Sequence, residues 1–457
     1  MTEETSALLA ELTTFLRDEP ELVKVNRQLK DKGDRDVKLV EFSPWSQVPD
    51  ELIERARSLI FADTCPKPLH RAAGALLGLA VADWVGAPLE FLEVVDEPSA
   101  SCWDHDAFTW RNPNKNELER GVLKPGQWTD DTSMALCLAD SLALHGRLDG
   151  SDLRLRFWCW FGEGMNNPFR FDAERGDRRS FGLGLNTAKS LMALKPLEPI
   201  EAIYVNPGSS DSGNGGLMRL APVAIFFPRL EEALDAAAQS SLTTHPGALA
   251  TEAARYLAFL LHSAIHRGDA SEVEMSAREF LIQTSAAYAA RLDSVAVLPA
   301  EAEEQRAAQA EVRALATSSK ESALERCWNW QEPTLDLRST FRARGEKYNG
   351  HPVSRCYAGS YCMDGLAMAL HAVASTDCFD RAIEKAVNFL GDADTVGAIA
   401  GQLAGAFYGA SSIDARTMVE LLDDDCYLEA LKTWDRGEIT CRAAFCHLKG
   451  ATLLRSH

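Results

Sequence analysis

Apolar residues recur at helical spacing over most of this chain, while the alternating pattern typical of strands is nearly absent. Long stretches rich in Ala, Leu and Gly predict helices at 133–145, 246–266, 365–374 and 394–409. In the last of these, glycine recurs every four residues and lines one face. Because each glycine inside a helix costs about 1 kcal/mol relative to alanine, the stripe predicts a central helix in very close contact with a neighbour. We therefore expect an all-α fold.

The first 67 residues differ from the rest in pattern. Apolar residues at helical spacing predict a short amphipathic helix over 6–16, and they are Leu8, Leu9, Leu12, Phe15 and Leu16. The run at 37–42 predicts a short strand, and Asp50 can cap a second helix. The prolines at 66 and 68 then predict a linker. We expect an N-terminal extension over 1–67 and one large helical domain over 68–457, with a charged helical insertion at 272–326 on its outside.

Composition and charge restrict the partners and the location. Hydrophobic content is 46%, charged content is 25% and the formal net charge is −20. This charge argues against nucleic acid and anionic membranes as partners. The N-terminal sequence lacks the features of a secretory signal, and no apolar stretch is long enough to predict a membrane span. The 11 cysteines form no CxxC pair, so we expect reduced thiols in a cytoplasmic protein.

Two acidic clusters, far apart in the sequence, each open a helical segment: Thr129-Asp130-Asp131-Thr132 and Gly391-Asp392-Ala393-Asp394-Thr395. Adjacent carboxylates repel one another unless a cation neutralises them. Carboxylate and hydroxyl oxygens are the ligands that Mg²⁺, Mn²⁺ and Ca²⁺ prefer. If the two clusters meet in space, they can hold a two-metal centre that activates water. The alternative is that each cluster only caps its helix, since Thr and Asp favour that position.

Four further segments carry candidate chemistry. The turn at 83–90 has two carboxylates, Asp83 and Glu90, and the glycine-rich loop at 213–222 with Arg219 can cradle a phosphate. The segment 243–246 places His245 at a helix start, and 355–361 offers aromatic side chains that can stack on a base or ribose. Each segment alone also fits a structural role as a tight turn, a cap, an ion pair or a core aromatic.

Taken in order, these motifs resemble the ADP-ribosylglycohydrolase family, which includes dinitrogenase reductase activating glycohydrolase. The matching segments are GALLGLAVADWVGAPLE (74–90), GQWTDDTSMAL (126–136), GNGGLMRLAP (213–222), THPGALATEAA (244–254), AGSYCMDGLAMAL (358–370) and GDADTVGAIAGQLAGAFYGA (391–410). They cover about residues 70–410 and leave the extension outside. One departure is Ala82, where the family usually has glycine.

The resemblance implies a compact, orthogonal all-α helical fold with a dinuclear Mg²⁺ site, in which Mn²⁺ can substitute. The implied metal ligands are Thr129, Asp130, Asp131, Asp392, Asp394 and Thr395. The implied catalytic carboxylates are Asp131, Asp394 and Glu90. The implied ADP-ribose contacts are Gly213, Asn214, Gly215, Gly216, Arg219, His245, Tyr357, Gly359, Ser360 and Tyr361.

The family reaction is hydrolysis of an ADP-ribosyl bond, so the resemblance implies that an ADP-ribosylated protein is the substrate. We expect the arginine linkage first and serine-linked or free ADP-ribose second. Some bacterial members serve as immunity proteins against ADP-ribosylating toxins, and such a protein can act by binding as well as by hydrolysis. An extension with an amphipathic helix and a strand could plug a toxin's active site, or it could simply pack on its own domain.

Overall fold

The computed structural model describes residues 1–18, 20–25, 38–94, 101–113, 123–171, 180, 182–206, 212–268, 275–294, 303–344, 347–348, 351–352, 357–417 and 437–454. Its α-helices are α1 (Glu3–Asp18), α2 (Asp50–Ile60), α3 (Lys67–Gly86), α5 (Asp130–His145), α6 (Gly150–Glu163), α7 (Leu185–Met192), α8 (Gly215–Met218), α9 (Ala221–Phe226), α10 (Leu230–Leu242), α11 (Ala248–His266), α12 (Ala277–Ser294), α13 (Glu303–Ala316), α14 (Leu337–Ala343), α15 (Cys362–Ala374), α16 (Phe379–Val387), α17 (Ala393–Tyr408) and α19 (Glu438–Leu453). The strands form three short antiparallel hairpins, β1 (Glu21–Val25) with β2 (Lys38–Phe42), β3 (Cys102–Asp104) with β4 (Thr109–Arg111), and β5 (Lys347–Tyr348) with β6 (His351–Pro352).

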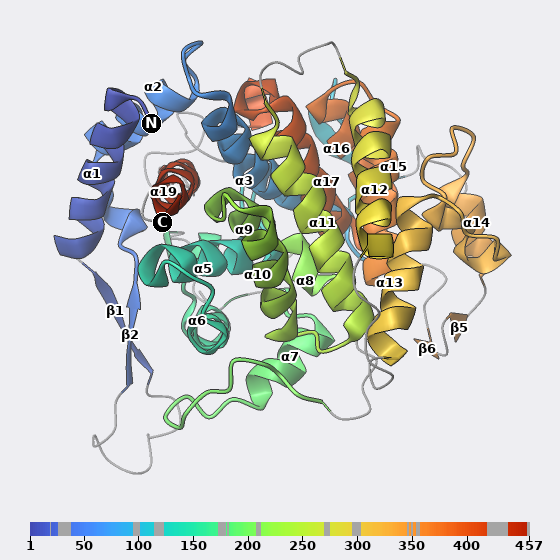
Figure 1. Ribbon diagram of the computed structural model, residues 1–457, viewed down its shortest axis with the longest axis horizontal. Coiled ribbons are helices and arrows are strands. Elements are labelled where there is room, and N and C mark those ends of the chain that lie inside the picture. The colour runs from blue at the N-terminus through green and yellow to red at the C-terminus, as the bar shows by residue number, and fades with distance from the viewer. Residues whose placement is uncertain are drawn as a thin grey trace.

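Helices α3 and α17 lie side by side at the centre of the molecule (Figure 1). Their backbones touch through glycine. A Cβ atom added at Gly405 would lie 1.9 Å from the carbonyl oxygen of Gly74, and one at Gly401 would lie 2.1 Å from that of Gly78. Gly86, at the end of α3, meets the start of α17 in the same way. The two helices therefore run antiparallel, and the predicted close contact of the glycine stripe is confirmed.

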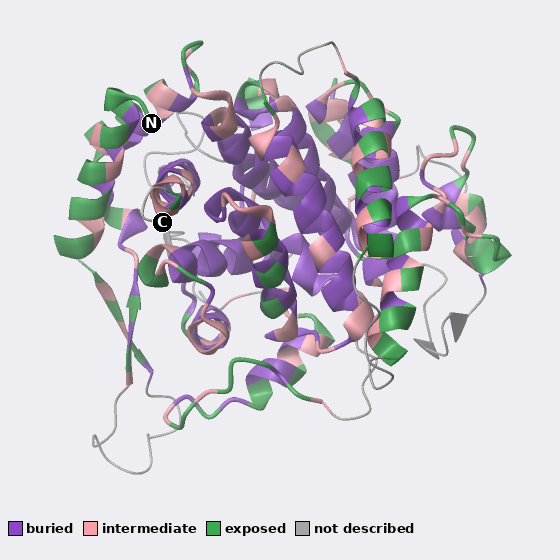
Figure 2. Ribbon diagram, in the orientation of Figure 1, coloured by how far each residue is buried: buried purple, intermediate pink, exposed green. Residues whose placement is uncertain are grey.

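The remaining helices surround this pair and bury it. Figure 2 shows α3, α17 and α11 almost entirely buried, whereas α12 exposes one side along its length. The buried Tyr288 of α12 donates a hydrogen bond of 2.6 Å to Glu252 of α11, so the segment expected as an outer insertion packs directly on the core. The stretch Lys67–Leu89 is long and apolar enough to cross a membrane, but its most apolar 18-residue window is entirely buried in this fold. The described cysteines are free, and all except Cys378 are buried.

The N-terminal extension shares its core with the rest of the chain. Leu8 and Leu12 of α1 are fully buried. Trp45 packs between Phe15 and Phe445, at centroid distances of 6.2 and 6.0 Å. Its indole N–H donates a hydrogen bond of 2.9 Å to a carboxylate that lies deep in α5. The inner faces of α1 and of the segment around Trp45 therefore pack on the main domain of the same chain. This is the second of the two alternatives given above for the extension.

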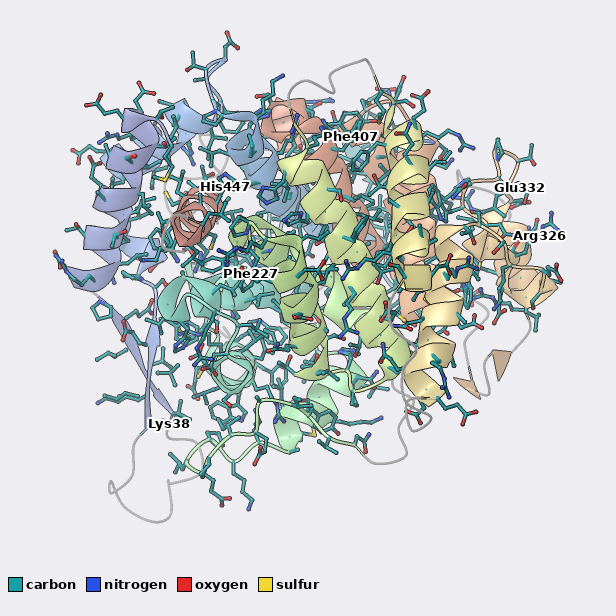
Figure 3. The ribbon with its side chains drawn as sticks, in the orientation of Figure 1. Lys38, Phe227, Arg326, Glu332, Phe407 and His447 are labelled. Atoms are coloured by element: carbon teal, nitrogen blue, oxygen red, sulfur yellow. The ribbon has the colours of Figure 1, made fainter. Side chains whose placement is uncertain are left out.

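The β1–β2 hairpin of the extension, in contrast, is buried on one face only. Its inner residues, including Val25 and Val40, are buried. Leu22 and Leu39 on the outer face are 56% and 51% exposed. Figure 3 shows Lys38, the first residue of β2, at the end of the hairpin that points away from the helices. The exposed apolar surface of the extension is thus on the hairpin and not on the buried stripe of α1.

We expect Gly405→Ala to lower the free energy of unfolding by about 3 kcal/mol or more, because the new methyl group would overlap backbone that no side-chain movement can clear. The matched control is Gly184→Ala, where the new methyl group meets nothing within 4 Å and the change should stay within about 1 kcal/mol. Urea unfolding of both variants measures the difference. A stabilised Gly405→Ala protein would show that the two helices do not touch.

Leu12→Ala should cost about 2–5 kcal/mol, since it leaves a cavity under α1. Leu22→Ala on the exposed hairpin face should be nearly neutral. Thermal unfolding of the full chain compares the two variants. Equal melting temperatures would mean that α1 is a free arm.

Candidate metal centre and substrate site

Asp83 fixes the start of α5 to the end of α3. Its carboxylate is fully buried and accepts hydrogen bonds from Thr129 and Thr132. The backbone N–H groups donate at 3.0 Å each, and the two hydroxyls donate at 2.8 and 2.6 Å. Thr129 makes no side-chain cap of its own, so Asp83 supplies the cap from another helix. This arrangement orients the first turn of α5, which carries the first acidic cluster.

The antiparallel contact of α3 and α17 brings the second acidic cluster to the same place. Oxygen atoms of Asp83, Asp131 and Asp394 lie within 4.8 Å of one another. Oxygen atoms of Glu90, Asp392 and Asp394 do so as well. Asp394 belongs to both groups, so two cation-sized sites adjoin at this residue. The two clusters, some 260 residues apart in the sequence, meet as expected.

The hydroxyl of Thr129 links these carboxylates. In addition to Asp83, it lies 3.1 Å from Asp131 Oδ2 and 3.4 Å from Asp394 Oδ2. Asp394 Oδ1 accepts a hydrogen bond of 2.8 Å from the backbone N–H of Thr395. Both aspartates lie in the first turn of a helix, where the helix dipole favours negative charge. Asp130 and Thr395 are buried beside them.

Burial and mutual repulsion make the cluster unfavourable as a set of bare charges. Burial, and then the charges of neighbouring aspartates, raises the pKa of Asp131 and of Asp394 well above the usual range. Burial, and then the charges of Asp394 and Asp392, does the same to the pKa of Glu90. Such groups stabilise the fold while they are protonated, below the ordinary pKa of about 4, and this contribution is lost as the pH rises through the folded pKa.

The donor set fits a hard divalent cation. Among the described residues, none of the aspartates of the cluster forms an ion pair with Lys or Arg. The Oδ1 atom of Asp131 is buried and accepts no hydrogen bond there. Converging carboxylate and hydroxyl oxygens with an unsatisfied acceptor are what Mg²⁺ or Mn²⁺ binds. These residues can therefore hold a metal.

The glycine loop and the segment 357–361 lie together beside the carboxylates. Gly213 and Tyr361 form an isolated antiparallel bridge, and the N–H of Asn214 donates to the carbonyl of Ser360 at 3.0 Å. The side-chain amide of Asn214 donates to Asp392 at 2.7 Å and to the Gly359 carbonyl at 3.0 Å. The predicted substrate-binding residues are thus attached directly to the second acidic cluster.

His245 lies against the glycine loop. A Cβ atom at Gly215 would be 2.5 Å from its Cε1 atom, so only glycine fits there. The Nδ1 atom of His245 is 2.8 Å from the Thr244 hydroxyl. Burial, and then the charge of Arg219, lowers the pKa of His245 to about 3, so the imidazole is neutral at physiological pH. Gly216 packs against Ser241 in a similar way.

Arg219 binds the turn that precedes His245 from the buried side of that turn. Its guanidinium is fully buried, donates to the Ser240 carbonyl at 3.0 Å and to the Thr244 hydroxyl at 2.8 Å, and lies 4.6 Å from the centroid of the Phe157 ring. Burial lowers its pKa to about 9. We expected a direct phosphate contact. The structure instead surrounds this cation with protein atoms, so it positions the His245 turn.

Comparison with known proteins adds independent evidence. The family model described as ADP-ribosylglycohydrolase matches residues 64–442. The chain is 30% identical to ADP-ribosylarginine hydrolase Tri1 of Pseudomonas putida (strain GB-1), over 85% of this chain and 83% of the relative. It is 28% identical to the protein of that name from Serratia proteamaculans (strain 568), over 83% and 80% of the two chains. It is also 28% identical to the ADP-ribosyl-[dinitrogen reductase] glycohydrolase of Rhodospirillum rubrum, over 78% and 92%.

The chain belongs to the ADP-ribosylglycohydrolase family. The resemblance found in the sequence motifs is confirmed, and so is the all-α fold of this family. The match begins at residue 64, close to the boundary expected between the extension and the main domain. Of the predicted substrate segment 355–361, Arg355 and Cys356 lie outside the described residues.

Sequence reasoning missed two residues of this glycohydrolase site. The sequence indicates Asp83 only as part of an acidic turn, because its four hydrogen bonds to the start of α5 depend on a helix pairing that the sequence does not show. Gly182, with φ of +86°, belongs to none of the predicted motifs. A Cβ atom there would lie 2.4 Å from Asp130 Oδ1, so this position must stay glycine for the chain to pass over the cluster. Its only sequence signal is a glycine between two apolar residues, Phe181 and Leu183.

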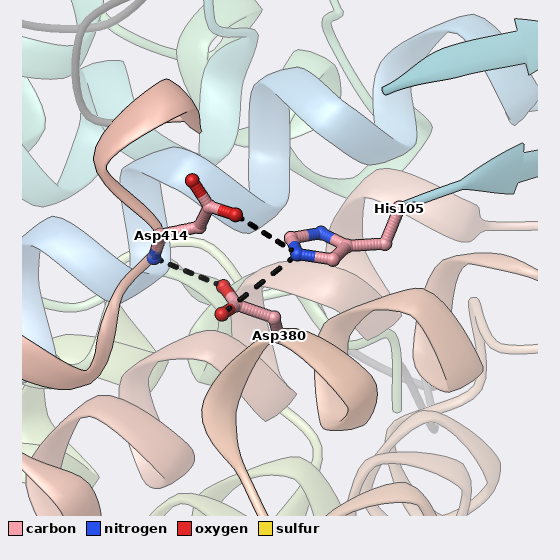
Figure 4. A group of neighbouring side chains, drawn as sticks. All are labelled: His105, Asp380 and Asp414. Carbon is pink, nitrogen blue, oxygen red and sulfur yellow. Dashed lines mark hydrogen bonds and ion pairs between the residues drawn. The ribbon is translucent and has the colours of Figure 1, made fainter. Parts of the chain in front are cut away.

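A second group of potential metal ligands lies apart from this site (Figure 4). His105 Nε2 is 3.1 Å from Asp414 Oδ2 and 3.9 Å from Asp380 Oδ2. Arg416 supplies a counter-charge, since its Nη2 atom donates to Asp414 at 2.7 Å. The group joins the turn between β3 and β4 to α16 and to the segment after α17. These contacts link three separate segments, so the group has a structural role.

Asp394→Asn tests the charge balance of the centre. In EDTA the variant should melt about 2 °C above the wild type, because one of the repelling charges is gone while the acceptor for the Thr395 N–H remains. In excess Mg²⁺ the order should reverse, since the wild type gains about 2.7 kcal/mol at a concentration of 100 Kd and the variant lacks the shared ligand. Differential scanning calorimetry measures both. The control is the exposed Asp235→Asn, and an equal Mg²⁺ effect on all three proteins would contradict the proposed ligand role.

Proposed function

We propose that this protein is an ADP-ribosylarginine hydrolase with two Mg²⁺ ions, for which Mn²⁺ can substitute. The observation that carries the proposal is the sharing of Asp394 by two adjacent carboxylate groups, beside a glycine loop and a neutral, buried histidine. Two relatives, each matched over four-fifths or more of its length, are named ADP-ribosylarginine hydrolases, and this favours the arginine linkage over others.

The ligands of the ions follow from the two carboxylate groups. Asp131, Asp394 and Thr129 would hold one ion, and Asp392, Asp394 and Glu90 the other, with Asp130 and Thr395 completing the oxygen set. When bound, the metals would neutralise the carboxylates, grip the ribose hydroxyls and lower the pKa of a bound water. Asp83 stays occupied by its four hydrogen bonds and orients the others.

The reaction breaks the bond between C1 of the distal ribose and a guanidinium nitrogen. A water oxygen bonds to C1, the ribose passes through an oxocarbenium-like transition state, and the departing nitrogen keeps the bonding electron pair and takes a proton. Glu90 is suited to accept the proton of the water, because burial and the charges of Asp394 and Asp392 raise its pKa and its carboxylate lies beside both of these aspartates. Asp131 and Asp394 would stay negatively charged and would keep the metal ions in position during this step.

The glycine loop and His245 would position the ADP-ribose part. The first turn of α8 follows directly on Asn214, so backbone N–H groups of Gly215 and Gly216 are available for diphosphate oxygens. A neutral His245 can donate or accept one hydrogen bond without repelling or attracting the diphosphate. Gly359 and Ser360 pair with the loop and close its other side.

The proposal is tested with a small ADP-ribosyl-arginine substrate, with release of ADP-ribose as the measured quantity. Activity should require Mg²⁺ or Mn²⁺ and disappear in EDTA. Asp131→Asn and Glu90→Gln should each lower kcat by about 100-fold or more, while Asp235→Asn should match the wild type. Activity only on a serine-linked substrate would replace the arginine assignment, and activity in EDTA would refute the metal centre.

A second function is favoured by the exposed face of the β1–β2 hairpin. Leu22 and Leu39 are exposed on it, and the hairpin has free edges within the described part of the chain. Such a surface suits strand addition by a protein partner. We propose an ADP-ribosyltransferase toxin as this partner, which would make the protein an immunity protein in the cytoplasm.

Binding and hydrolysis can be separated by two variants. Leu22→Lys combined with Leu39→Lys should weaken binding to the toxin about tenfold or more and leave hydrolysis and stability unchanged, because neither side chain is buried. Asp131→Asn should do the opposite. Isothermal titration calorimetry and the hydrolysis assay measure the two properties, and unchanged binding by the hairpin variant would exclude this surface.

A further inference from the structure

An aromatic pair, Phe91 with Tyr357, stands next to the carboxylates, and the function proposed above gives no role to Phe91. The rings of Phe91 and Tyr357 are stacked, with centroids 5.3 Å apart and an interplanar angle of 12°. The hydroxyl of Tyr357 donates to Glu90 Oε1 at 3.0 Å. Glu90 in turn lies within 4.8 Å of Asp392 and Asp394. One end of the pair therefore touches the reactive site.

The other end of the pair faces outward. Phe91 is 57% exposed, which places it among the large apolar side chains that the fold leaves uncovered. A single stacked contact with Tyr357 does not explain why so much apolar surface is kept at the edge of a highly charged site. A single exposed apolar side chain is common on a protein surface, but Phe91 is stacked on Tyr357, whose hydroxyl is hydrogen-bonded to Glu90 at the carboxylate site.

The backbone holds Phe91 in this position at a cost. Its φ is +62°, in the left-handed region that a bulky side chain rarely occupies. The N–H of Phe91 donates to the Gly391 carbonyl at 2.9 Å, and the N–H of Gly391 donates to the Leu92 carbonyl at 2.9 Å. These bonds tie the residue to the start of the second acidic cluster. Strained backbone that the surrounding structure holds in place is found most often at active sites and ligand contacts.

We infer that the stacked pair of Phe91 and Tyr357 is the platform on which the guanidinium of the ADP-ribosylated arginine lies, so that Phe91 determines the preference for arginine linkages. This inference rests on the proposed function. A guanidinium is planar and cationic, and it stacks on aromatic faces by cation–π attraction. The nearby carboxylates attract the same cation. A serine linkage offers no planar cation and would gain nothing from the platform.

The test compares the full chain with two variants at one position, Phe91→Leu and Phe91→Tyr. Both keep a branched or aromatic side chain at the same backbone angle, so the strain at φ of +62° is shared. The measured quantities are KM and kcat for an ADP-ribosyl-arginine substrate, and the Kd of free ADP-ribose with Mg²⁺ present. Thermal unfolding reports on folding.

Phe91→Leu should raise KM for the arginine substrate roughly threefold to thirtyfold, while Phe91→Tyr stays close to the wild type. The Kd of ADP-ribose, which lacks the guanidinium, should be unchanged in both. Equal kinetics of Phe91→Leu and the wild type would overturn the inference while the proposed function stands. A parallel loss of ADP-ribose affinity would also overturn it, because the pair would then hold the nucleotide. If the wild type itself fails to cleave the arginine substrate, the proposed function fails, and the inference with it.

Discussion

The backbone contact between α3 and α17 is the constraint on which the site depends. Gly74 and Gly78 on one helix face Gly405 and Gly401 on the other, at a separation that leaves no space for a methyl group. This antiparallel pairing puts the end of α3, with Asp83, next to the start of α17, with Asp392 and Asp394. A separation larger by one side chain would move the second acidic cluster away from the first. The glycines cost helix stability, and the close packing offsets it.

The carboxylate centre is built at the expense of stability. Several acids are buried together, and the helix starts, the Thr129 hydroxyl and Asn214 give them only hydrogen bonds as compensation. Buried charges of this kind are stabilised when a cation binds between them. The rest of the molecule can bear the cost because its core is large and continuous. Rigid glycine contacts around the carboxylates keep them from relaxing apart.

One part of the N-terminal extension is buried in the core of the main domain, and another part, the β1–β2 hairpin, is exposed on its outer face. Trp45 donates to Asp140, and Arg442 of α19 forms an ion pair with the same carboxylate at 2.9 Å, so the extension closes a buried polar network of the main domain. Removing it would leave Asp140 short of one partner and α1's apolar stripe uncovered. The hairpin, by contrast, adds little to the core on its outer face. The proposed binding role therefore falls to the hairpin, whereas the inner faces of α1 and of the segment around Trp45 are part of the core.

The sequence by itself determined the helical class, the main helices, the family and the two acidic clusters, because helical periodicity and short motifs are local properties of the chain. It also indicated that the glycine stripe of 397–409 needs a close neighbour. Only the tertiary structure decided which helix that neighbour is, that Asp83 caps α5, and that Arg219 lies behind the site rather than in it. The same holds for Gly182 over Asp130 and for the stacking of Phe91 on Tyr357. These features join residues tens to hundreds of positions apart, and their geometry follows from packing, which no local pattern encodes.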